Sequence, residues 1–385
     1  VGVVGRDGRA LDGATVAVAV ESPVTLEASA LSGSTSGAVA EAVAGLDALR
    51  PDVGDLELTV STSPVAGLAV GLEQLVDYPH GCTEQTVSRL VPLLALRDLA
   101  GALGVTLPPD VDGASRQAVT RLLDHRSPDG RFGLWPGSRP SPWLTTYAYW
   151  GLAEAQRRGL PVDPAVMAEG RAALSDTVAH APDSPAAAAE ACFALDVLAP
   201  LPGAAVVHAR TVARQLLAAP DALPLFARAL LLHALVDLGV DAAERAPLLR
   251  SIESSLHVDG ATARAVEAGP SLDDQLDSRA RTSALVLRAL VAAAPAHPLR
   301  EPLARGLVAD RGPKGWRTTQ ETAWALLALD AYRRTLPPPP SALAARAALG
   351  PASLLDVTLA GVEERTARLP MADLVAAAGA PLHIE

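Results

Sequence analysis

Cysteine and aromatic residues are scarce in this chain of 385 residues. It has 2 cysteines, Cys82 and Cys192, and aromatic residues make up 3% of it. A framework of several disulfides is therefore excluded as a source of stability. Hydrophobic residues reach 49%, with Ala and Leu dominant, so a large core is available and close packing of helices is favoured. Cys192 stands in the apolar helical run 188–195, which predicts an inert core residue.

Positive charge is also limited, because Lys is almost entirely replaced by Arg and the formal net charge is -11. This balance argues against a nucleic-acid partner, which requires a basic face. No apolar run reaches the roughly 18 residues of a membrane-spanning helix, and no signal peptide is visible. Because the first residue is Val, we expect the chain to be part of a longer protein.

Several kinds of catalytic and cofactor site are missing as well. The sequence has no pair of His or Cys residues at the spacing of metal ligands that is accompanied by a second such pair. The sequence has no Walker loop, no Gly-x-Gly-x-x-Gly string and no nucleophile elbow around a serine. We therefore expect neither a metal nor a cofactor.

The most informative stretch is Gly81-Cys82-Thr83-Glu84-Gln85, in which a thiol precedes a carboxamide by three residues. If this stretch takes a helical turn, Cys82 and Gln85 lie on one face with Cβ atoms roughly 5–6 Å apart. The Cys82 thiolate can then attack the side-chain carbonyl of Gln85 and expel ammonia, which leaves an internal thioester. Such a bond would acylate one incoming amine or hydroxyl and release the thiol. The alternative is that Cys82 is a small buried hydrophobe beside Gln85 by chance.

Strand patterns at both ends of the chain flank a long helical block. The simplest interpretation is one small β domain, formed by residues 1–62 and 349–385, which is interrupted by a helical domain at 63–348. Alternation of polar and apolar side chains and enrichment in Val carry the strand predictions. The predicted strands are 14–20, 55–61, 354–361 and 381–384, with 38–49 as strand or loop.

Within the helical block, apolar helices recur every roughly 40–55 residues with an amphipathic helix between them, which is typical of stacked helical hairpins. In a closed ring the apolar helices would form an inner barrel and the amphipathic ones an outer wall, and an open solenoid is the alternative. We also expect a compact, packed turn at 127–137 and an irregular loop with a short hairpin within 255–280. The predicted helices are 65–76, one from near Cys82 to Leu99, 110–125 with Asp112 or Ser115 as cap, one opening at Pro142, 164–178, 186–198, 202–217, 225–238, 281–293 and 319–332.

The string Gly-Cys-Thr-Glu-Gln resembles the Gly-Cys-x-Glu-Gln motif of the thioester proteins, which include complement components and the α2-macroglobulins. Tyr78-Pro79 and residues 86–90 are similar to the bacterial α2-macroglobulin branch, although His80 stands where a second Tyr is expected. Residues 143–147 and 316–329 look like two further family strings, so the resemblance covers nearly the whole chain. It implies a mainly α fold, an α/α toroid of helical hairpins inserted in a small β-sandwich domain of CUB type.

The resemblance also implies a function. The parent molecule would be a protease trap: a protease cuts a bait region outside this chain, the thioester becomes exposed, and Gln85 acylates a Lys of the protease while Cys82 is released. This would make the protein an endopeptidase inhibitor with a single-turnover thioester, not an enzyme. Its partners would be captured proteases and neighbouring macroglobulin domains, with a membrane reached only through a lipid anchor outside this chain. The family implies a periplasmic or extracellular role in bacterial defence.

A thioester persists only while water is kept from it, and aromatic side chains are natural shields. Tyr78 adjoins the motif in sequence, and Trp143 and Tyr147 are the best candidates from elsewhere in the ring. These three could equally be ordinary core aromatics. Some complement relatives use a His that attacks the thioester first and directs transfer to hydroxyls. We interpret His125 and His180 as surface residues, so transfer to amines is the default prediction.

Three other classes of protein remain open. An α/α-toroid enzyme of glycoside- or terpene-processing type would need acidic clusters, and the helical block has Asp273-Asp274 as its single adjacent acidic pair, in a loop. A Cys–His hydrolase using Cys82 with His80 or His180 would turn over, but it leaves Gln85 without a purpose. A structural domain that has lost its thioester is disfavoured because Cys82 and Gln85 are both present.

Overall fold

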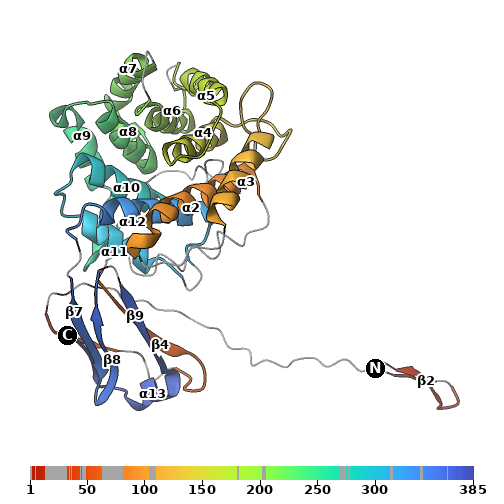
Figure 1. The fold of residues 1–385 in the computed structure, drawn as a ribbon, viewed down its shortest axis with the longest axis vertical. Coiled ribbons are helices and arrows are strands. Elements are labelled where there is room, and N and C mark those ends of the chain that lie inside the picture. Colours follow the sequence, from red (N-terminus) through yellow and green to blue (C-terminus); the bar gives the residue numbers. More distant parts are fainter. Residues whose placement is uncertain are drawn as a thin grey trace.

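The chain forms a group of helices beside a smaller group of strands (Figure 1). The predicted strand at 14–20 and the predicted helix at 65–76 lie outside the described residues. This computed structural model describes residues 2–4, 6–13, 33, 35, 37–43, 45, 49–62, 81–103, 110–179, 182–201, 205–268, 272, 275, 278–312, 315–338, 341–361 and 363–385.

Six apolar helices of the described chain form the inner wall of a closed ring. Each packs on the next along the chain, and α12 packs back on α2. The predicted toroid is therefore confirmed, and the open solenoid is wrong. These helices are apolar on most faces because both neighbours and the outer layer cover them. The inner helices are α2 (Thr83–Leu103), α4 (Pro142–Arg157), α6 (Pro185–Leu198), α8 (Leu225–Asp237), α10 (Arg279–Ala293) and α12 (Thr319–Arg333).

Amphipathic helices pack on the outside of this ring and turn their polar faces to solvent. The predicted cap of the first one is wrong. Asp110, at φ 63°, caps it by accepting the N–H of Gly113 at 3.0 Å, since an Asp tolerates the left-handed region and its short side chain reaches back to the turn. The outer helices are α3 (Val111–Asp124), α5 (Pro164–Thr177), α7 (Ala205–Leu217), α9 (Ala242–Glu253) and α11 (Arg300–Ala309), with a short 3-10 turn, η2 (Pro220–Ala222), before α8.

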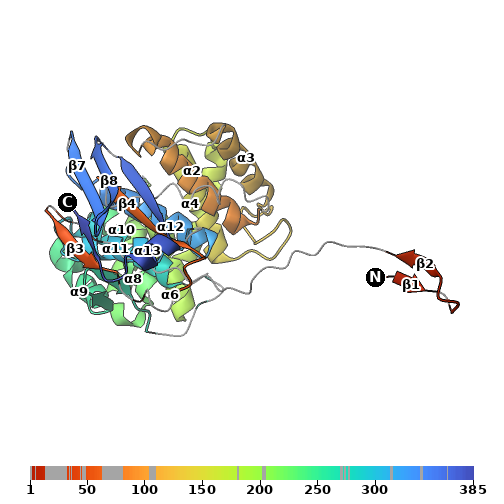
Figure 2. The same cartoon turned by 90° about the horizontal axis from the view of Figure 1, so that it is seen from below.

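Strands from both sides of the helical ring pair with one another. The strand β4 (Asp55–Ser61) runs antiparallel to β9 (Glu364–Pro370), and β3 (Val39–Ala42) runs antiparallel to β10 (Pro381–Ile384). The ring is therefore an insertion within a β domain, as predicted. In Figure 1 the strands lie below the helices, and Figure 2, seen from below, shows β3 and β4 in front of them.

The β part has a four-stranded sheet in the order β3-β10-β7-β8 and a separate β4–β9 pair. The predicted boundary between residues 348 and 349 falls inside β7, a strand that the Ala-rich composition of this stretch concealed. Leu374 of a short helix packs on Leu349 and Leu382 beneath the sheet. The remaining elements are β7 (Leu343–Leu349), β8 (Ala352–Leu359), α13 (Met371–Ala376) and a hairpin of β1 (Gly2–Val4) and β2 (Ala10–Gly13).

A short hairpin, β5 (Leu256–Asp259) with β6 (Thr262–Ala265), interrupts the helices where the sequence predicts it. Its backbone packs directly on α11. A Cβ added at Gly306 would lie 2.2 Å from the carbonyl oxygen of Ala263. Glycine at this position thus permits a close approach between helix and hairpin.

Replacing Gly306 with Ala is expected to destabilise the protein by about 1–3 kcal/mol, because backbone must move to admit the methyl group. Urea unfolding followed by circular dichroism measures this loss. Gly37→Ala is the control, since a Cβ there meets no atom within 4 Å. Equal stability of the two variants would contradict the close packing.

Candidate functional site

The first turn of α2 brings Cys82 and Gln85 together. The N–H of Cys82 donates to Oε1 of Gln85 at 3.2 Å, and the N–H of Gln85 points at Sγ of Cys82 at 3.4 Å. The helix starts here because the N–H of Thr86 bonds to the carbonyl of Cys82 at 2.9 Å. The helical turn that the motif predicts is therefore present, with thiol and carboxamide facing each other.

This geometry favours attack by sulfur on the carboxamide. The Cys82 N–H holds and polarises the Gln85 carbonyl oxygen, on which negative charge develops during attack. Cys82 is 6% exposed, and burial raises the pKa of its thiol, as does the nearby Glu84 carboxylate, while the N–H of Gln85 opposes this. The resting group is thus the thiol, and thiolate attack requires loss of its proton.

Thr83 joins the motif to a loop that the sequence analysis did not connect with it. Its hydroxyl donates to the carbonyl of Gly133 at 2.6 Å, and its N–H donates to the carbonyl of Leu134 at 2.9 Å. Nδ1 of His125 lies 3.1 Å from the same hydroxyl. Because the Thr83 proton points to Gly133, the hydroxyl accepts from His125, so Nδ1 carries the hydrogen.

His125 is buried at 7% exposure, so the prediction of a surface histidine is wrong for this residue. Burial lowers the pKa of His125, and the positive charge of Arg121 lowers it further. The guanidinium of Arg121 also lies over the motif, 2.7 Å from where a Cβ on Gly81 would stand. A neutral imidazole and a guanidinium therefore flank the start of the reactive turn. No sequence pattern pairs Arg121 of α3, or His125 at its C-cap, with Thr83, about 40 positions earlier.

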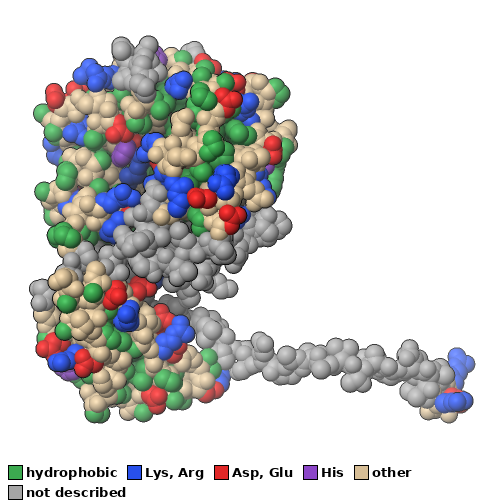
Figure 3. Space-filling model, viewed as in Figure 1, with side chains coloured by type: hydrophobic (Ala, Val, Ile, Leu, Met, Phe, Trp, Pro, Cys, Tyr) green, Lys and Arg blue, Asp and Glu red, His purple; other side chains and the backbone are tan. Residues whose placement is uncertain are grey.

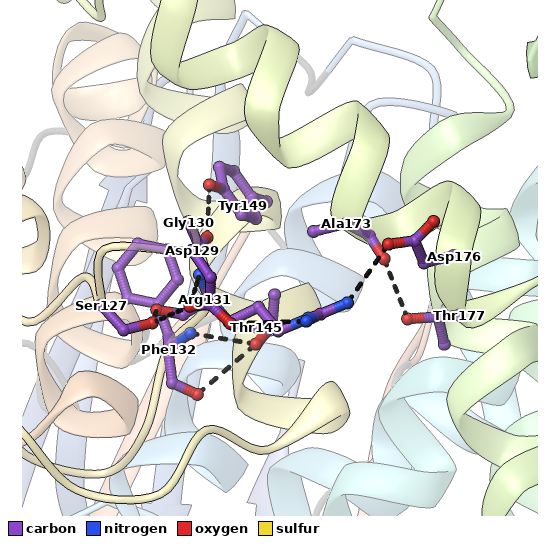
Figure 4. Close-up of polar contacts among 10 residues, drawn as sticks. All are labelled: Ser127, Asp129, Gly130, Arg131, Phe132, Thr145, Tyr149, Ala173, Asp176 and Thr177. Carbon is purple, nitrogen blue, oxygen red and sulfur yellow. Dashed lines mark hydrogen bonds and ion pairs between the residues drawn. The ribbon is translucent and has the colours of Figure 1, made fainter.

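The loop at 127–137 is the compact, packed turn that the sequence predicts (Figure 4). Side chains of α4 and α5 hold its first half, and its second half carries Gly133 and Leu134 to Thr83. The rigid loop therefore fixes the motif from one side. The anchoring bonds run from Tyr149 Oη to Gly130 O (2.7 Å), from Phe132 N to Thr145 Oγ1 (3.0 Å) and from Arg131 to Asp176 (3.2 Å).

Thr83→Val is expected to destabilise the protein by about 1–3 kcal/mol, because it leaves the buried carbonyl of Gly133 without its hydroxyl donor. Thr83→Ser keeps the hydroxyl and should recover most of the loss. Chemical denaturation measures both differences. If serine and valine destabilise equally, the hydroxyl is not what holds the loop.

The loop also places apolar surface beside the motif. Leu134 and Trp135 are 43% and 49% exposed, and the Trp135 ring lies 6.3 Å from that of His125. On the face drawn in Figure 3, Arg and acidic side chains are interspersed over both helices and strands. The loop that bonds to Thr83 thus exposes two large apolar side chains.

Trp143 and Tyr147, two of the three aromatic residues expected to shield the bond, lie inside the ring. Trp143 packs on Phe193 at 4.7 Å between ring centroids, and Tyr147 is fully buried and stacks on Trp150 at 5.3 Å. The Tyr147 hydroxyl reaches Ser88, one turn beyond Glu84, at 2.8 Å. Both residues belong to the aromatic core, and their shielding role stays a prediction. Tyr78, His80, His180 and Asp273-Asp274 lie outside the described residues.

The described residues also bear on other kinds of site. They contain no group of three or more His, Cys, Asp or Glu side chains placed to hold a metal ion. Among the helices that the structure describes, none is long and apolar enough to cross a membrane.

The region that carries the Cys-Gln turn is similar to a known domain of the macroglobulins. Residues 54–177 match the family model of the A-macroglobulin TED domain. The alpha-2-macroglobulin of Ralstonia nicotianae is 34% identical over 127 residues, which are 30% of this chain and 8% of that protein. The chain is thus related to bacterial alpha-2-macroglobulins through this domain, and the match spans less than a tenth of the relative's length.

Solved structures show the same fold over most of the chain. Native alpha-2-macroglobulin of Escherichia coli, from domain MG7 to the C-terminus, matches with a TM-score of 0.65 and 20% identity over 90% of this chain and 54% of that one. Salmonella alpha-2-macroglobulin reacted with methylamine matches with a TM-score of 0.62 and 25% identity, over 85% and 21%. The mainly α toroid beside a small sheet is therefore a fold that these proteins share.

Proposed function

We propose that Cys82 and Gln85 form an internal thioester and that the chain is the reactive part of a protease trap. One observation supports this proposal: the Gln85 carboxamide oxygen accepts from the Cys82 N–H, and the Cys82 sulfur accepts from the Gln85 backbone N–H. Sulfur adds to the Gln85 side-chain carbon, the C–N bond breaks, and the thiol proton leaves with the amide nitrogen as ammonia. The product retains the acyl group in an activated form.

The second step would capture the target. A Lys amine of an attacking protease adds to the Gln85 carbonyl, the C–S bond breaks, and the Cys82 sulfur takes up a proton as a thiol. One isopeptide bond forms per molecule, so the protein acts as an endopeptidase inhibitor rather than as a turnover enzyme. Bait cleavage and complete shielding of the bond would come from neighbouring macroglobulin domains. By the same relationship, the strands are a CUB-type domain and the protein works in the periplasm or outside the cell.

Intact mass before and after methylamine, with a thiol titration alongside, tests the covalent step. The untreated protein should be about 17 Da below its sequence mass, the loss of one ammonia. Methylamine should add one adduct at Gln85 and release one thiol at Cys82. In Cys82→Ala the deficit and the adduct should both be missing. Full sequence mass with a titratable Cys82 in the untreated wild type would remove the covalent step.

A further inference from the structure

The carboxylate between the two reactive residues is buried, and its hydrogen bonds run to residues outside the motif. Glu84 is 8% exposed, and its Oε1 accepts from the Ser88 hydroxyl at 2.6 Å. The hydroxyl of Thr319 donates to both of its oxygens, at 3.0 and 3.2 Å. Within the described chain, these two hydroxyls are its hydrogen-bond donors, and no Arg, Lys or His side chain pairs with it.

Thr319 opens α12, the helix that closes the ring. The Thr318 side chain caps this helix by accepting the N–H of Glu321 at 3.1 Å, so the Glu84 carboxylate lies at a helix N-terminus. Burial raises the pKa of Glu84, and the hydrogen bonds from Ser88 and Thr319 oppose this. Glu84 also stands in the first turn of α2. One side chain therefore joins the first and last inner helices where each begins.

A second connection runs through the aromatic core beside the first. Ser88, which donates to Glu84, also bonds to Tyr147 of α4 at 2.8 Å. Tyr147 stacks on Trp150, which stacks on Trp324 of α12 at 4.3 Å between centroids and 15° between planes. The first turn of α2 is thus tied to α12 both directly and through α4.

We propose that Glu84 is a positioning residue for the thioester: its bond to Thr319 fixes the turn that sets Cys82 against Gln85, so formation of the bond depends on closure of the ring by α12. This inference deepens the proposed function and rests on it. Cys82 and Gln85 flank Glu84, so a rotation of the first turn moves both reacting groups. Displacements of about 1 Å between reacting groups can slow a reaction roughly a hundredfold.

A variant at Thr319 tests this link without altering the motif, since Thr319 is 235 positions from Glu84. Thr319→Val removes the hydroxyl and keeps the shape, whereas Thr319→Ser keeps the hydroxyl. Thr322→Val is the matched control, because the Thr322 hydroxyl bonds to Thr318 O of its own helix at 3.0 Å. We expect Thr319→Val to form the bond roughly tenfold more slowly after refolding, by intact mass, with normal rates in Thr319→Ser and Thr322→Val. Equal rates in Thr319→Val and Thr322→Val overturn the inference and leave the thioester standing.

If the wild type shows no mass deficit, the proposed function is contradicted, and a second measurement tests the role of Glu84. Cys82 is then a free thiol, and its native alkylation by iodoacetamide reports the same turn. Thr319→Val should label Cys82 several-fold faster than Thr322→Val, and Cys192, fully buried, serves as an unlabelled internal standard. Equal labelling of Cys82 in the two variants overturns the positioning role in that case.

Discussion

Replacing Gln85 with Asn will leave the protein at its full sequence mass, with a Cys82 thiol that methylamine does not alter. In the wild type the Cys82 N–H holds the Gln85 oxygen at 3.2 Å. Asn is one methylene shorter, so its carbonyl would lie farther from both this N–H and the Cys82 sulfur. Positioning of this kind supplies a large share of the rate of an intramolecular acyl transfer. The expected loss of thioester is complete within the sensitivity of intact mass spectrometry.

Two further variants separate the effect of side-chain length from that of the reacting group. Gln85→Glu keeps the length but offers a carboxylate, which resists attack by a thiolate, so this variant should also show the full sequence mass. Cys192→Ala removes the other thiol, which is fully buried in α6, and should retain the 17 Da deficit expected for the wild type. A mass deficit in Gln85→Asn would contradict the dependence on side-chain length, and a 17 Da deficit in Gln85→Glu would show that the carboxamide of Gln85 is not the acyl donor.

Asp196→Asn is expected to cost about 3–5 kcal/mol of stability, the largest loss among the stability variants considered. Asp196 of α6 has a fully buried side chain that binds Nδ1 of His233 at 2.7 Å and Arg288 at 2.8 Å. These partners stand on α8 and α10, so one carboxylate joins three adjacent inner helices. Asparagine retains the shape but removes the negative charge that faces the buried Arg288 guanidinium. Denaturant unfolding at neutral pH measures the difference.

The same carboxylate makes a defined contribution to acid stability. Burial alone would raise the pKa of Asp196, but attraction by Arg288 and His233 and the hydrogen bonds to them lower it from 3.8 to about 2. Between these two values the unfolded chain binds more protons, so this contribution is complete above pH 3.8 and is lost as pH falls through about 2. The difference corresponds to about 2 kcal/mol.

The wild-type advantage over Asp196→Asn should therefore shrink by about 2 kcal/mol between pH 4 and pH 2. Asp237→Asn is the control, because Asp237 lies 3.6 Å from His233 with its side chain 33% exposed and should change stability little. A wild-type advantage that is constant across this pH range would contradict the low pKa of Asp196.

The features that could be predicted from the sequence are those that depend on local patterns of residues. The spacing of Cys82 and Gln85 determines which side chains meet once a helical turn forms, and the structure has that turn. Alternating apolar and amphipathic helices predicted the inner and outer layers, because burial on most faces requires apolar side chains around the helix. The strand at 55–61 was equally clear, since its polar residues alternate with apolar ones.

What could not be predicted depends on contacts between distant segments. Thr83 and His125 meet because a loop and a helix pack on the motif, and neither residue stands in a recognisable pattern. Glu84 was visible in the motif, but its partner Thr319 is defined only once the ring closes. The strand β9 escaped prediction because Arg, Glu and Thr dominate its sequence, and pairing with β4 rather than burial makes it a strand.

The pairing of β4 with β9 has a consequence for synthesis on the ribosome. Residues 55–61 bond to residues 364–370, so about 300 further residues must be made before β4 meets its partner. At 5–20 residues per second this delay is roughly 15–60 s, during which an unpaired strand is a template for aggregation. Asp55 and Glu57 place charge on the open strand and oppose such association. Glu57 thus carries its charge on the open strand well before it forms its ion pair with Arg368 in the finished protein.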